Sequence, residues 1–402
     1  KKKKNFKKIW QKKKNVVEKK EYVLGRVGTN LQIGIVGLPN VGKSTFFNAL
    51  TKSAIPAENF PFCTIDPNEA RVAVPDERFD WLAKHWNPGS VVPAYLRVVD
   101  IAGLVRGAAS GEGLGNAFLS HIKACDAIFH MVRSFENSEI THTEGSVDPL
   151  RDIKIISKEL LLKDEEFLQK KHDLLFRAAQ TGDKEKKVEL ETIKKALELV
   201  KNDNEIRFGE WSNKDIYYLN QYQLITAKPV IFLVNMSPKD YKDKNNQHYD
   251  QIKKYIKERS EGRDSILPFS AEMERKFIKL ENKKGKEAVA EFCKKMKVQS
   301  ALPDIIVLGF ATLGLHFYFT AGVKEVKCWT IKKGTKAPQA AGKIHTDFED
   351  TFIAADVMKF DEYKEHGSEA AVKSAGLYKK QGRSYEVEDG DILLFHFGER
   401  KK

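Results

Sequence analysis

Long hydrophobic runs and closely spaced cysteines are both missing from this sequence. No stretch of 18 consecutive apolar residues occurs among its 402 residues, so we expect a soluble protein without a membrane-spanning helix. Its four cysteines, Cys63, Cys125, Cys293 and Cys328, lie far apart and do not make the ligand spacing of a zinc site. Free thiols in a reducing compartment are the default for such a chain, which predicts a cytoplasmic protein.

Acidic residues are nearly absent from the first 20 positions, where eleven Lys face the single acid Glu18. This segment carries +10 of the formal net charge of +13, which leaves +3 for the rest of the chain. Such a run is either a mobile solvated arm or a segment that binds RNA or an acidic protein surface. It contains neither Arg nor Ser, which argues against an organelle-targeting peptide. We expect residues 1–24 to form a disordered, Lys-rich tail.

The rest of the chain has the composition of a globular protein. Hydrophobic residues make up 41% and aromatic residues 10%, enough for a sizeable core, and the length suggests two or three domains. Apolar runs alternate with helical patterns and resume after a long interruption, which predicts an α/β fold with a doubly wound, mostly parallel sheet. The expected strands are Leu31–Leu38, Tyr95–Ile101, Ala127–Val132, Pro229–Asn235 and Ser265–Ser270.

The interruption, residues 151–222, has apolar residues at helical spacing among dense Lys and Glu. The pattern breaks at Thr181–Gly182–Asp183, so we predict a long antiparallel helical hairpin. Such an insert serves either as a projecting docking arm or as a capping subdomain. From about residue 304 the sequence changes to a small α+β module. Its expected β segments are Val326–Ile331, Tyr385–Val387 and Ile392–Phe397.

Residues 37–44 match the pattern G-x-x-x-x-G-K-[ST], directly after an expected strand and before a helical pattern. Glycines in this pattern let successive backbone N–H groups turn toward phosphates, and the N-terminus of the following helix adds its positive dipole. We expect Lys43 to reach the β- and γ-phosphates of a nucleotide and the Ser44 hydroxyl to ligate Mg²⁺. The sequence therefore predicts a nucleotide-binding site.

Two further elements follow in the order typical of a nucleotide-driven switch. Asp100 ends an expected strand and Gly103 follows three residues later, as required for a water-mediated Mg²⁺ contact and for a backbone N–H that senses the γ-phosphate. Between this element and the phosphate loop, Thr64 supplies a hydroxyl that we expect to close onto the metal. Ser44, Thr64 and Asp100 are therefore the predicted metal residues.

Base recognition departs from the GTPase pattern. GTPases end the next strand with Asn-Lys-x-Asp, whose carboxylate accepts two hydrogen bonds from guanine, whereas here Asn235 is followed three residues later by Pro238. Guanine donors left unpaired cost much selectivity, while Asn235 still offers a donor to purine N7 and an acceptor to the adenine amino group. This pattern favours ATP. The alternative is a GTPase that reads guanine with Asp240, two positions out of register.

The residue that orients the attacking water also differs. Ras-like enzymes place Gln directly after Asp-x-x-Gly, whereas this chain has Leu104, which cannot position water. Either another residue supports hydrolysis, or the protein turns over slowly and acts mainly as a switch. Candidate replacements are His121, His130 and His142. His130 lies within an apolar strand and is expected to be structural, while His142 lies in the polar loop 137–144 and is the freest of the three.

Together these features resemble the Obg-like ATPases, the YchF subfamily of translation-factor-related P-loop proteins. The resemblance implies a G domain over residues 25–150 and 223–303, with an inserted antiparallel helical (coiled-coil) domain over 151–222. It also implies a C-terminal TGS domain, a ubiquitin-like β-grasp module, over 304–398. The blocks that carry the resemblance are Gly37–Thr45, Asn59–Asn68, Val99–Gly107, Gly113–His121, Ile331–Phe348 and Tyr385–Gly390.

The resemblance further implies residue roles. In relatives a loop histidine that matches His142 is proposed to support hydrolysis, and Leu104 is the hydrophobic substitution for the catalytic Gln. Asn40 resembles the residue that holds an activating K⁺, and Phe135 is similar to an aromatic that lies against adenine. Relatives usually carry an acid where Pro238 stands, so the chain departs from the family there. The catalytic set is His142, Lys43 and Leu104, and the nucleotide-binding set is Asn40, Val41, Gly42, Lys43, Ser44, Thr45, Phe135, Asn235, Met236 and Ser270.

Family members associate with ribosomes and influence translation and stress responses. We therefore expect a monomeric, Mg²⁺-dependent ATP hydrolase that binds ribosomes, with rRNA contacted through the basic tail or the TGS domain and no membrane partner. Two alternatives stay open. One is the GTPase with shifted base recognition through Asp240, and the other is a nucleotide-dependent scaffold for RNA or protein with negligible turnover.

Overall fold

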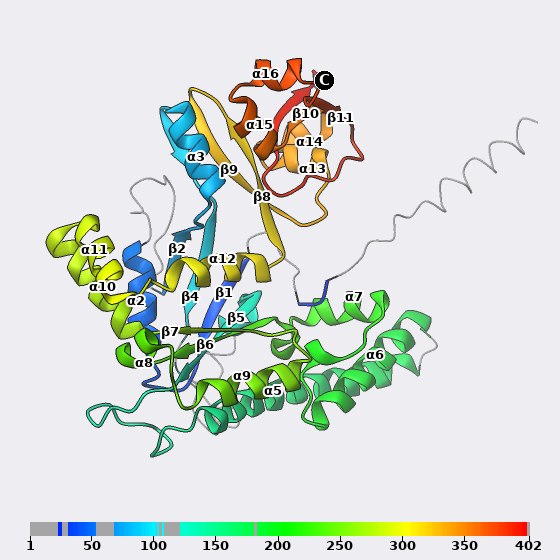
Figure 1. The fold of residues 1–402 in the computed structure, drawn as a ribbon. Coiled ribbons are helices and arrows are strands. Elements are labelled where there is room, and N and C mark those ends of the chain that lie inside the picture. The colour runs from blue at the N-terminus through cyan, green and yellow to red at the C-terminus, as the bar shows by residue number, and fades with distance from the viewer. Residues whose placement is uncertain are drawn as a thin grey trace, which may run out of the picture.

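The computed structural model describes residues 23–25, 31–53, 68–101, 103, 107, 121–180 and 183–399. Figure 1 shows an α/β body at the centre, an arm of long helices at the lower right and a C-terminal sheet at the top. Most of the Lys-rich tail and the predicted site residues Thr64 and Leu104 lie outside the described residues.

Six strands form the first sheet, in the order β2-β4-β1-β5-β6-β7. β2 is antiparallel to β4, and all other neighbours are parallel. Every residue of β5 and β6 is buried, as expected for strands covered on both faces. The five parallel strands confirm the predicted doubly wound sheet. The strands are β1 Gln32–Val36, β2 Glu69–Ala73, β4 Tyr95–Asp100, β5 Ala127–Arg133, β6 Val230–Asn235 and β7 Ser265–Phe269.

Helices cover this sheet, and one of them connects it to the C-terminal sheet. A Cβ atom on Gly309 would lie 2.9 Å from Phe129 Cζ, so the glycine lets α12 approach the first sheet closely. α12 also contacts β8 of the second sheet, and it therefore joins the two parts of the molecule. The helices are α2 Lys43–Ser53, α8 Pro238–Asp243, α9 Tyr249–Ser260, α10 Ala271–Lys284, α11 Lys286–Met296 and α12 Leu302–Thr312.

The inserted region forms the predicted antiparallel helical hairpin, α5 (Pro149–Ala179) and α6 (Lys184–Lys201), which projects from the body (Figure 1). Asp148 and Asp183 cap the two helix N-termini through their side chains. The chain returns through η2 (Ile206–Phe208), α7 (Asn213–Tyr222) and η3 (Ile225–Ala227). Buried Asp164 accepts hydrogen bonds from the Ile225 and Thr226 backbone N–H groups and from the Thr226 hydroxyl, so it anchors the hairpin beside β6.

The second sheet has the order β11-β10-β12-β8-β9-β3, with parallel pairs β12–β8 and β3–β9. The expected strand at Tyr385–Val387 is wrong, because the structure has only an isolated bridge between Lys336 and Glu386 there. The Asp391 carboxylate accepts hydrogen bonds from the Tyr385 hydroxyl and the Glu388 N–H, which turn this segment. The remaining elements are β3 Ser90–Val92, β8 Leu315–Ala321, β9 Glu325–Lys332, α13 Ala337–Gly342, α14 Thr346–Asp350, β10 Phe352–Met358, α15 Phe360–His366, α16 Glu369–Ser374, β11 Lys379–Gln381 and β12 Ile392–Phe397.

A short segment that lies in sequence between two strands of the first sheet packs on, and pairs with, the second sheet. α3 (Glu77–Trp86) and β3 precede β4, yet β3 pairs with β9. The ring of Phe79 stacks on that of Phe319, with centroids 6.2 Å apart. Arg78 of α3 donates to Asp389 at 2.8 Å and lies 5.5 Å from the centroid of the Phe317 ring. The C-terminal sheet is therefore completed by a strand from the body.

Two findings on the described residues bear on membrane topology and thiol state. No helix in this part of the chain is long and apolar enough to cross a membrane. Cys125, Cys293 and Cys328 are free thiols.

Candidate nucleotide-binding site

The segment between β1 and α2 has the backbone geometry of a phosphate-binding loop. Asn40 and Gly42 have positive φ angles of 62° and 104°, a conformation in which neighbouring N–H groups can turn to one side. A Cβ atom on Gly42 would lie 2.4 Å from Asn235 Nδ2, so this position has no room for a side chain. α2 begins at Lys43, and its N-terminus therefore adds a partial positive charge to the loop.

Lys43 is 8% exposed and its ammonium group lies inside the loop. Nζ donates to the carbonyl oxygens of Gly37 at 3.1 Å and Leu38 at 2.8 Å. Burial lowers the pKa of Lys43 to about 8, and nearby Asp100 counters part of this effect. A phosphate group would replace the carbonyl partners with full negative charge, which strengthens the cationic form.

The predicted metal side of the site has an acid with an unused oxygen. Burial raises the pKa of Asp100 and the Lys43 charge opposes that rise, while Oδ1 is buried without a hydrogen-bond partner among the described residues. Such an oxygen fits a water of a Mg²⁺ shell. Ser44, the residue after Lys43, is exposed, and a Cβ atom on Gly103 would lie 3.1 Å from Lys43 Nζ. These residues fit Mg²⁺ held mainly by phosphates and water.

A cavity of about 570 Å³ lies beside the phosphate loop. Eight predicted nucleotide-binding residues line it: Asn40, Gly42, Lys43, Ser44, Thr45, Phe135, Asn235 and Met236. Val41 is buried next to it, and Ser270 is buried as the cap of α10, where its hydroxyl accepts from Met273 N. Pro238, which the sequence marks as a departure in the base-recognition loop, also lines it. The sequence reading missed the other lining residues, which are Glu136, Asn137, Glu139, Ile140, Ser237, Ala271, Glu272 and Arg275.

Asn235 connects three parts of this cavity. Its Nδ2 donates to the Val41 carbonyl at 2.9 Å, and its Oδ1 accepts from the Ala271 N–H at 3.0 Å. The side chain is 3% exposed, so the amide is fixed between the phosphate loop and the first residue of α10. One Nδ2 hydrogen remains for a purine N7.

Pro238 stands at the first position of a helix. Ser237 caps α8 by accepting from the Asp240 N–H, and a proline without an N–H is well tolerated directly after such a cap. The Asp240 carboxylate accepts from Asn246 Nδ2 at 3.0 Å, and the same nitrogen donates to the Ser134 carbonyl at 2.7 Å. Asp240 is not among the residues that line the cavity, because its carboxylate is held against Asn246.

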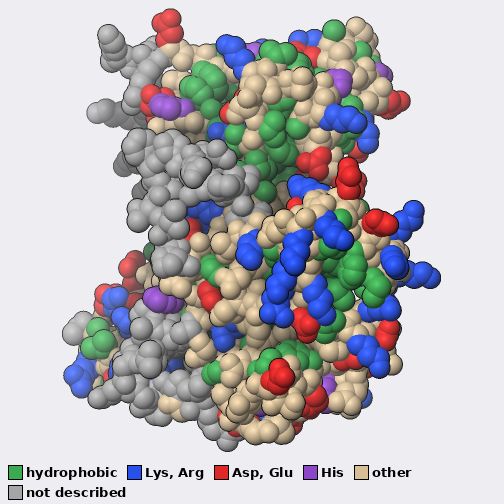
Figure 2. All heavy atoms as spheres, turned by 90° about the vertical axis from the view of Figure 1, so that its left-hand side faces the viewer, with side chains coloured by type: hydrophobic (Ala, Val, Ile, Leu, Met, Phe, Trp, Pro, Cys, Tyr) green, Lys and Arg blue, Asp and Glu red, His purple; other side chains and the backbone are tan. Residues whose placement is uncertain are grey.

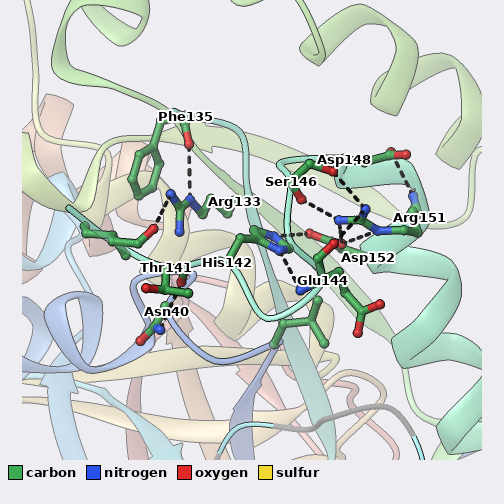
Figure 3. A network of polar contacts seen from close by, with 12 residues as sticks. Asn40, Arg133, Phe135, Thr141, His142, Glu144, Ser146, Asp148, Arg151 and Asp152 are labelled. Carbon is green, nitrogen blue, oxygen red and sulfur yellow. Dashed lines mark hydrogen bonds and ion pairs between the residues drawn. The ribbon is translucent and has the colours of Figure 1, made fainter. Parts of the chain in front are cut away.

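Arg133 shapes the loop that carries Phe135, and sequence analysis missed it because it reads as the end of an apolar strand. Its side chain is 1% exposed. Nε donates to the Phe135 carbonyl at 3.1 Å, and Nη2 donates to the carbonyls of Asn137 at 3.4 Å and Ile140 at 3.1 Å. The guanidinium carbon lies 4.7 Å from the centroid of the Phe135 ring (Figure 3). One buried cation therefore fixes both the ring and its loop.

His142 is not free, contrary to the expectation from its polar loop. It is 8% exposed, and its Nδ1 accepts from the Glu144 N–H at 3.1 Å. The proton is therefore on Nε2, which lies 2.9 Å from Asp152 Oδ2 in the first turn of α5. The same loop contacts the phosphate loop, since Asn40 Nδ2 donates to the Thr141 carbonyl at 3.1 Å (Figure 3). Burial raises the pKa of Asp152, with Arg151 and His142 opposing it.

The other candidate histidines differ in exposure. His130 is buried in β5, where burial lowers its pKa to about 3, which confirms the expected structural role. His121 is exposed. A separate contact ties the hairpin to the segment after Gly103: the Gly107 N–H donates to Glu159 Oε1 of α5 at 2.7 Å.

Known families match both halves of the chain. A family described as "50S ribosome-binding GTPase" matches residues 32–172, and the family YchF-GTPase_C, described as a protein of unknown function, matches residues 315–398. Each match covers one of the two sheets, at least in part.

Curated relatives match nearly the whole length. Obg-like ATPase 1 of Oryza sativa subsp. japonica is 54% identical over 386 residues, 96% of each chain. The Homo sapiens protein of the same name is 55% identical over 378 residues, 93% of this chain and 94% of that one. The solved structure of the Schizosaccharomyces pombe YchF GTPase superposes with a TM-score of 0.85 and 48% identity, covering 93% of this chain and 100% of that chain. With the phosphate-loop geometry above, these matches show that the chain belongs to the Obg-like ATPase (YchF) family of P-loop nucleotide hydrolases.

Proposed function

We propose that the protein binds and hydrolyses ATP in preference to GTP, with Mg²⁺, and uses the nucleotide state to regulate its association with ribosomes in the cytoplasm. The observation that carries the base preference is the position of Asp240. Its carboxylate is engaged by Asn246 outside the cavity, while Pro238 occupies the position of the guanine-binding acid. A guanine base would leave its donors without this carboxylate, which penalises GTP.

Adenine does not need a carboxylate at the position of Pro238. The free hydrogen on Asn235 Nδ2 suits a purine N7, and Phe135 offers an aromatic face. The carboxylates that do line the cavity belong to Glu136, Glu139 and Glu272, all exposed side chains at its rim. The GTPase alternative would now have to use one of these rather than Asp240.

Hydrolysis would use Lys43, Ser44 and Asp100 for the phosphates and Mg²⁺, with Thr64 completing the metal shell. Asn40 Oδ1 accepts no hydrogen bond from the described part of the chain and fits an activating K⁺. His142 would support the attacking water only after it separates from Asp152, because both ring nitrogens are engaged. Leu104 supplies no polar group, so turnover is expected to be slow.

Nucleotide state would reach the rest of the molecule through two contacts. Asn40 links the phosphate loop to the loop of His142, and Gly107 links the segment after Gly103 to Glu159 of α5. A γ-phosphate that draws Gly103 inward would therefore pull on the helical hairpin. This coupling favours a switch that acts on a ribosome through its projecting arm over a passive scaffold.

The test is equilibrium binding of ATP and GTP with Mg²⁺ in potassium and in sodium buffer, followed by hydrolysis in the same four conditions. We expect tighter ATP binding, turnover stimulated by potassium, and an unchanged ATP-to-GTP ratio in Asp240→Asn. His142→Ala should retain ATP affinity and lose turnover. Tighter GTP binding that Asp240→Asn abolishes would overturn the base assignment, and ATP binding without turnover in any buffer would leave the scaffold alternative.

A further inference from the structure

One pair of adjacent helices beside the nucleotide cavity carries a net positive charge. Residues 271–297, which form α10, α11 and their connection, contain nine Lys or Arg and five Glu, a net charge of +4. The chain outside this segment and the first 20 residues carries −1. We call residues 271–297 the basic hairpin. This helical pair is therefore one of the basic segments of the described protein, together with residues 324–343, which hold six Lys and one Glu.

All nine cations of the basic hairpin are exposed, whereas one of its five acids, Glu274, is buried. Figure 2 shows Lys and Arg side chains gathered over the middle of the face that α10 and α11 form. Arg275, Lys279 and Lys283 recur every four residues, so they lie on one side of α10 at intervals of about 6 Å. The nine cations are Arg275, Lys276, Lys279, Lys283, Lys284, Lys286, Lys294, Lys295 and Lys297.

Most of these charges have no local partner. Lys276 pairs with Glu272 at 2.9 Å. Within the described residues no ion pair involves Lys279, Lys283 or Lys284. Unpaired charges at such spacing repel one another. An approaching anion relieves this repulsion and lowers the free energy of the surface.

The basic hairpin is held rigidly on the body. The buried Glu274 carboxylate accepts from the Ser300 hydroxyl at 2.6 Å and the Ala301 N–H at 2.8 Å, just before α12. Met273 and Phe277 are buried between the two helices and α8. A partner bound here therefore meets a preformed surface and pays little ordering entropy.

The chemistry of this surface favours a nucleic acid over an acidic protein. Protein interfaces need an apolar or aromatic anchor at their centre, and none of the exposed large hydrophobic residues of the described chain lies between positions 271 and 297. Eight of the nine cations are Lys, which contact phosphates as point charges and read no base sequence. A polyanionic backbone meets this surface without needing any apolar contact.

The surface also begins at the nucleotide cavity. Arg275 and Glu272 line that cavity, and Ala271 is bonded to Asn235. We propose that the basic hairpin binds the phosphate backbone of RNA, independently of its sequence, beside the mouth of the nucleotide site. The inference deepens the proposed function, on which it rests, by assigning the RNA contact to α10 and α11 instead of the tail or the C-terminal module alone.

The experiment compares the full chain with the triple variant Lys279→Gln, Lys283→Gln, Lys284→Gln. Binding of a labelled uridine oligonucleotide of about 20 nucleotides is followed by fluorescence anisotropy between about 50 and 200 mM KCl. Each lost phosphate contact lowers the slope of log affinity against log salt by about 0.7, so the triple variant should lose about 2 in slope. Glutamine keeps good helix propensity, and circular dichroism checks that α10 is retained.

A matched control removes the same charge from another exposed helix face, through Lys253→Gln, Lys254→Gln and Lys257→Gln on α9. This control should keep most of the salt slope. Equal salt slopes for the two triple variants would overturn the proposal. So would an α10 triple variant that keeps the wild-type salt slope for RNA but no longer binds a labelled polyglutamate peptide, because the surface would then bind acidic proteins. The titration is done without nucleotide, so its outcome is independent of whether ATP or GTP is the substrate. Normal ATP binding by the α10 variant shows that the cavity is intact.

Discussion

The contact between Arg133 and Phe135 makes a prediction about ATP affinity that a double-mutant cycle can test. Arg133 holds three loop carbonyls and lies against the Phe135 ring, which lines the nucleotide cavity. Lys in its place keeps the charge, but its N–H donors all lie on one nitrogen, which cannot take the places of both Nε and Nη2, so we expect it to lose part of the contacts to the three carbonyls. We expect Arg133→Lys to loosen the loop and to weaken ATP binding only through the position of Phe135.

The structure sets the size of each effect. Hydrogen bonds to a charged group contribute about 1.5–3 kcal/mol each, and we expect one or two to be lost, although the loop carbonyls regain water. We therefore expect the free energy of unfolding to fall by roughly 2–4 kcal/mol. Stacking of a base on an aromatic ring contributes about 1–3 kcal/mol, so Phe135→Ala should raise the Kd for ATP about 5- to 150-fold. Arg133→Lys, which misplaces the ring without removing it, should raise the Kd by a smaller factor, roughly three- to tenfold.

The assay is calorimetric or fluorescence titration of ATP into the wild type, both single variants and the double variant. Because Arg133 acts through the ring of Phe135, the double variant should bind ATP no more weakly than Phe135→Ala alone, within about 0.5 kcal/mol. Additive losses would refute the reasoning and would mean that Arg133 meets the nucleotide by a separate route.

Three further predictions concern single groups. The pKa of Lys43 is lowered to about 8 in the nucleotide-free protein, and phosphate favours its charged form, so ATP affinity should fall as pH rises above about 8, by at most about tenfold per pH unit. A flat affinity between about pH 7 and 9.5 would contradict this. Asp152→Asn weakens the contact that holds His142 and should raise ATP turnover several-fold at saturating ATP, whereas a large loss would show that the acid orients the histidine for catalysis. Arg78→Ala removes the ion pair to Asp389 and the packing on Phe317, and urea denaturation should show about 2–3 kcal/mol lower stability in one transition. A change below about 0.5 kcal/mol would mean that this contact contributes little to docking.

The sequence predicted the parts of the fold that have a strong period or a fixed motif. The five parallel strands are continuous apolar runs, and the hairpin shows helical spacing over 31 and 18 residues, so local pattern sufficed. β3 was missed because it has three residues, two of them exposed, and its partner β9 lies more than 200 positions away in the sequence. No local signal marks such a pairing.

The site divides in the same way. Lys43, Gly42 and Asp100 follow from motifs with fixed spacing, and the structure brings them together. The positions of Arg133 and His142 depend on the path of an irregular loop, which has no period. An arginine that ends an apolar strand looks like a surface residue, yet Arg133 is 1% exposed because three carbonyls converge on it.

The pairing of β3 with β9 limits how this chain can be divided. Only Pro93 and Ala94 separate β3, in the second sheet, from β4, in the first. A fragment that begins at residue 304 would keep β9 but lose β3, leaving a row of backbone N–H and C=O groups without partners. Such a bare edge recruits strands from other molecules. The C-terminal module is thus continuous in sequence, but its sheet is completed only by a strand from the G domain. The isolated fragment would be prone to self-association, which the intact chain prevents with the three residues of β3.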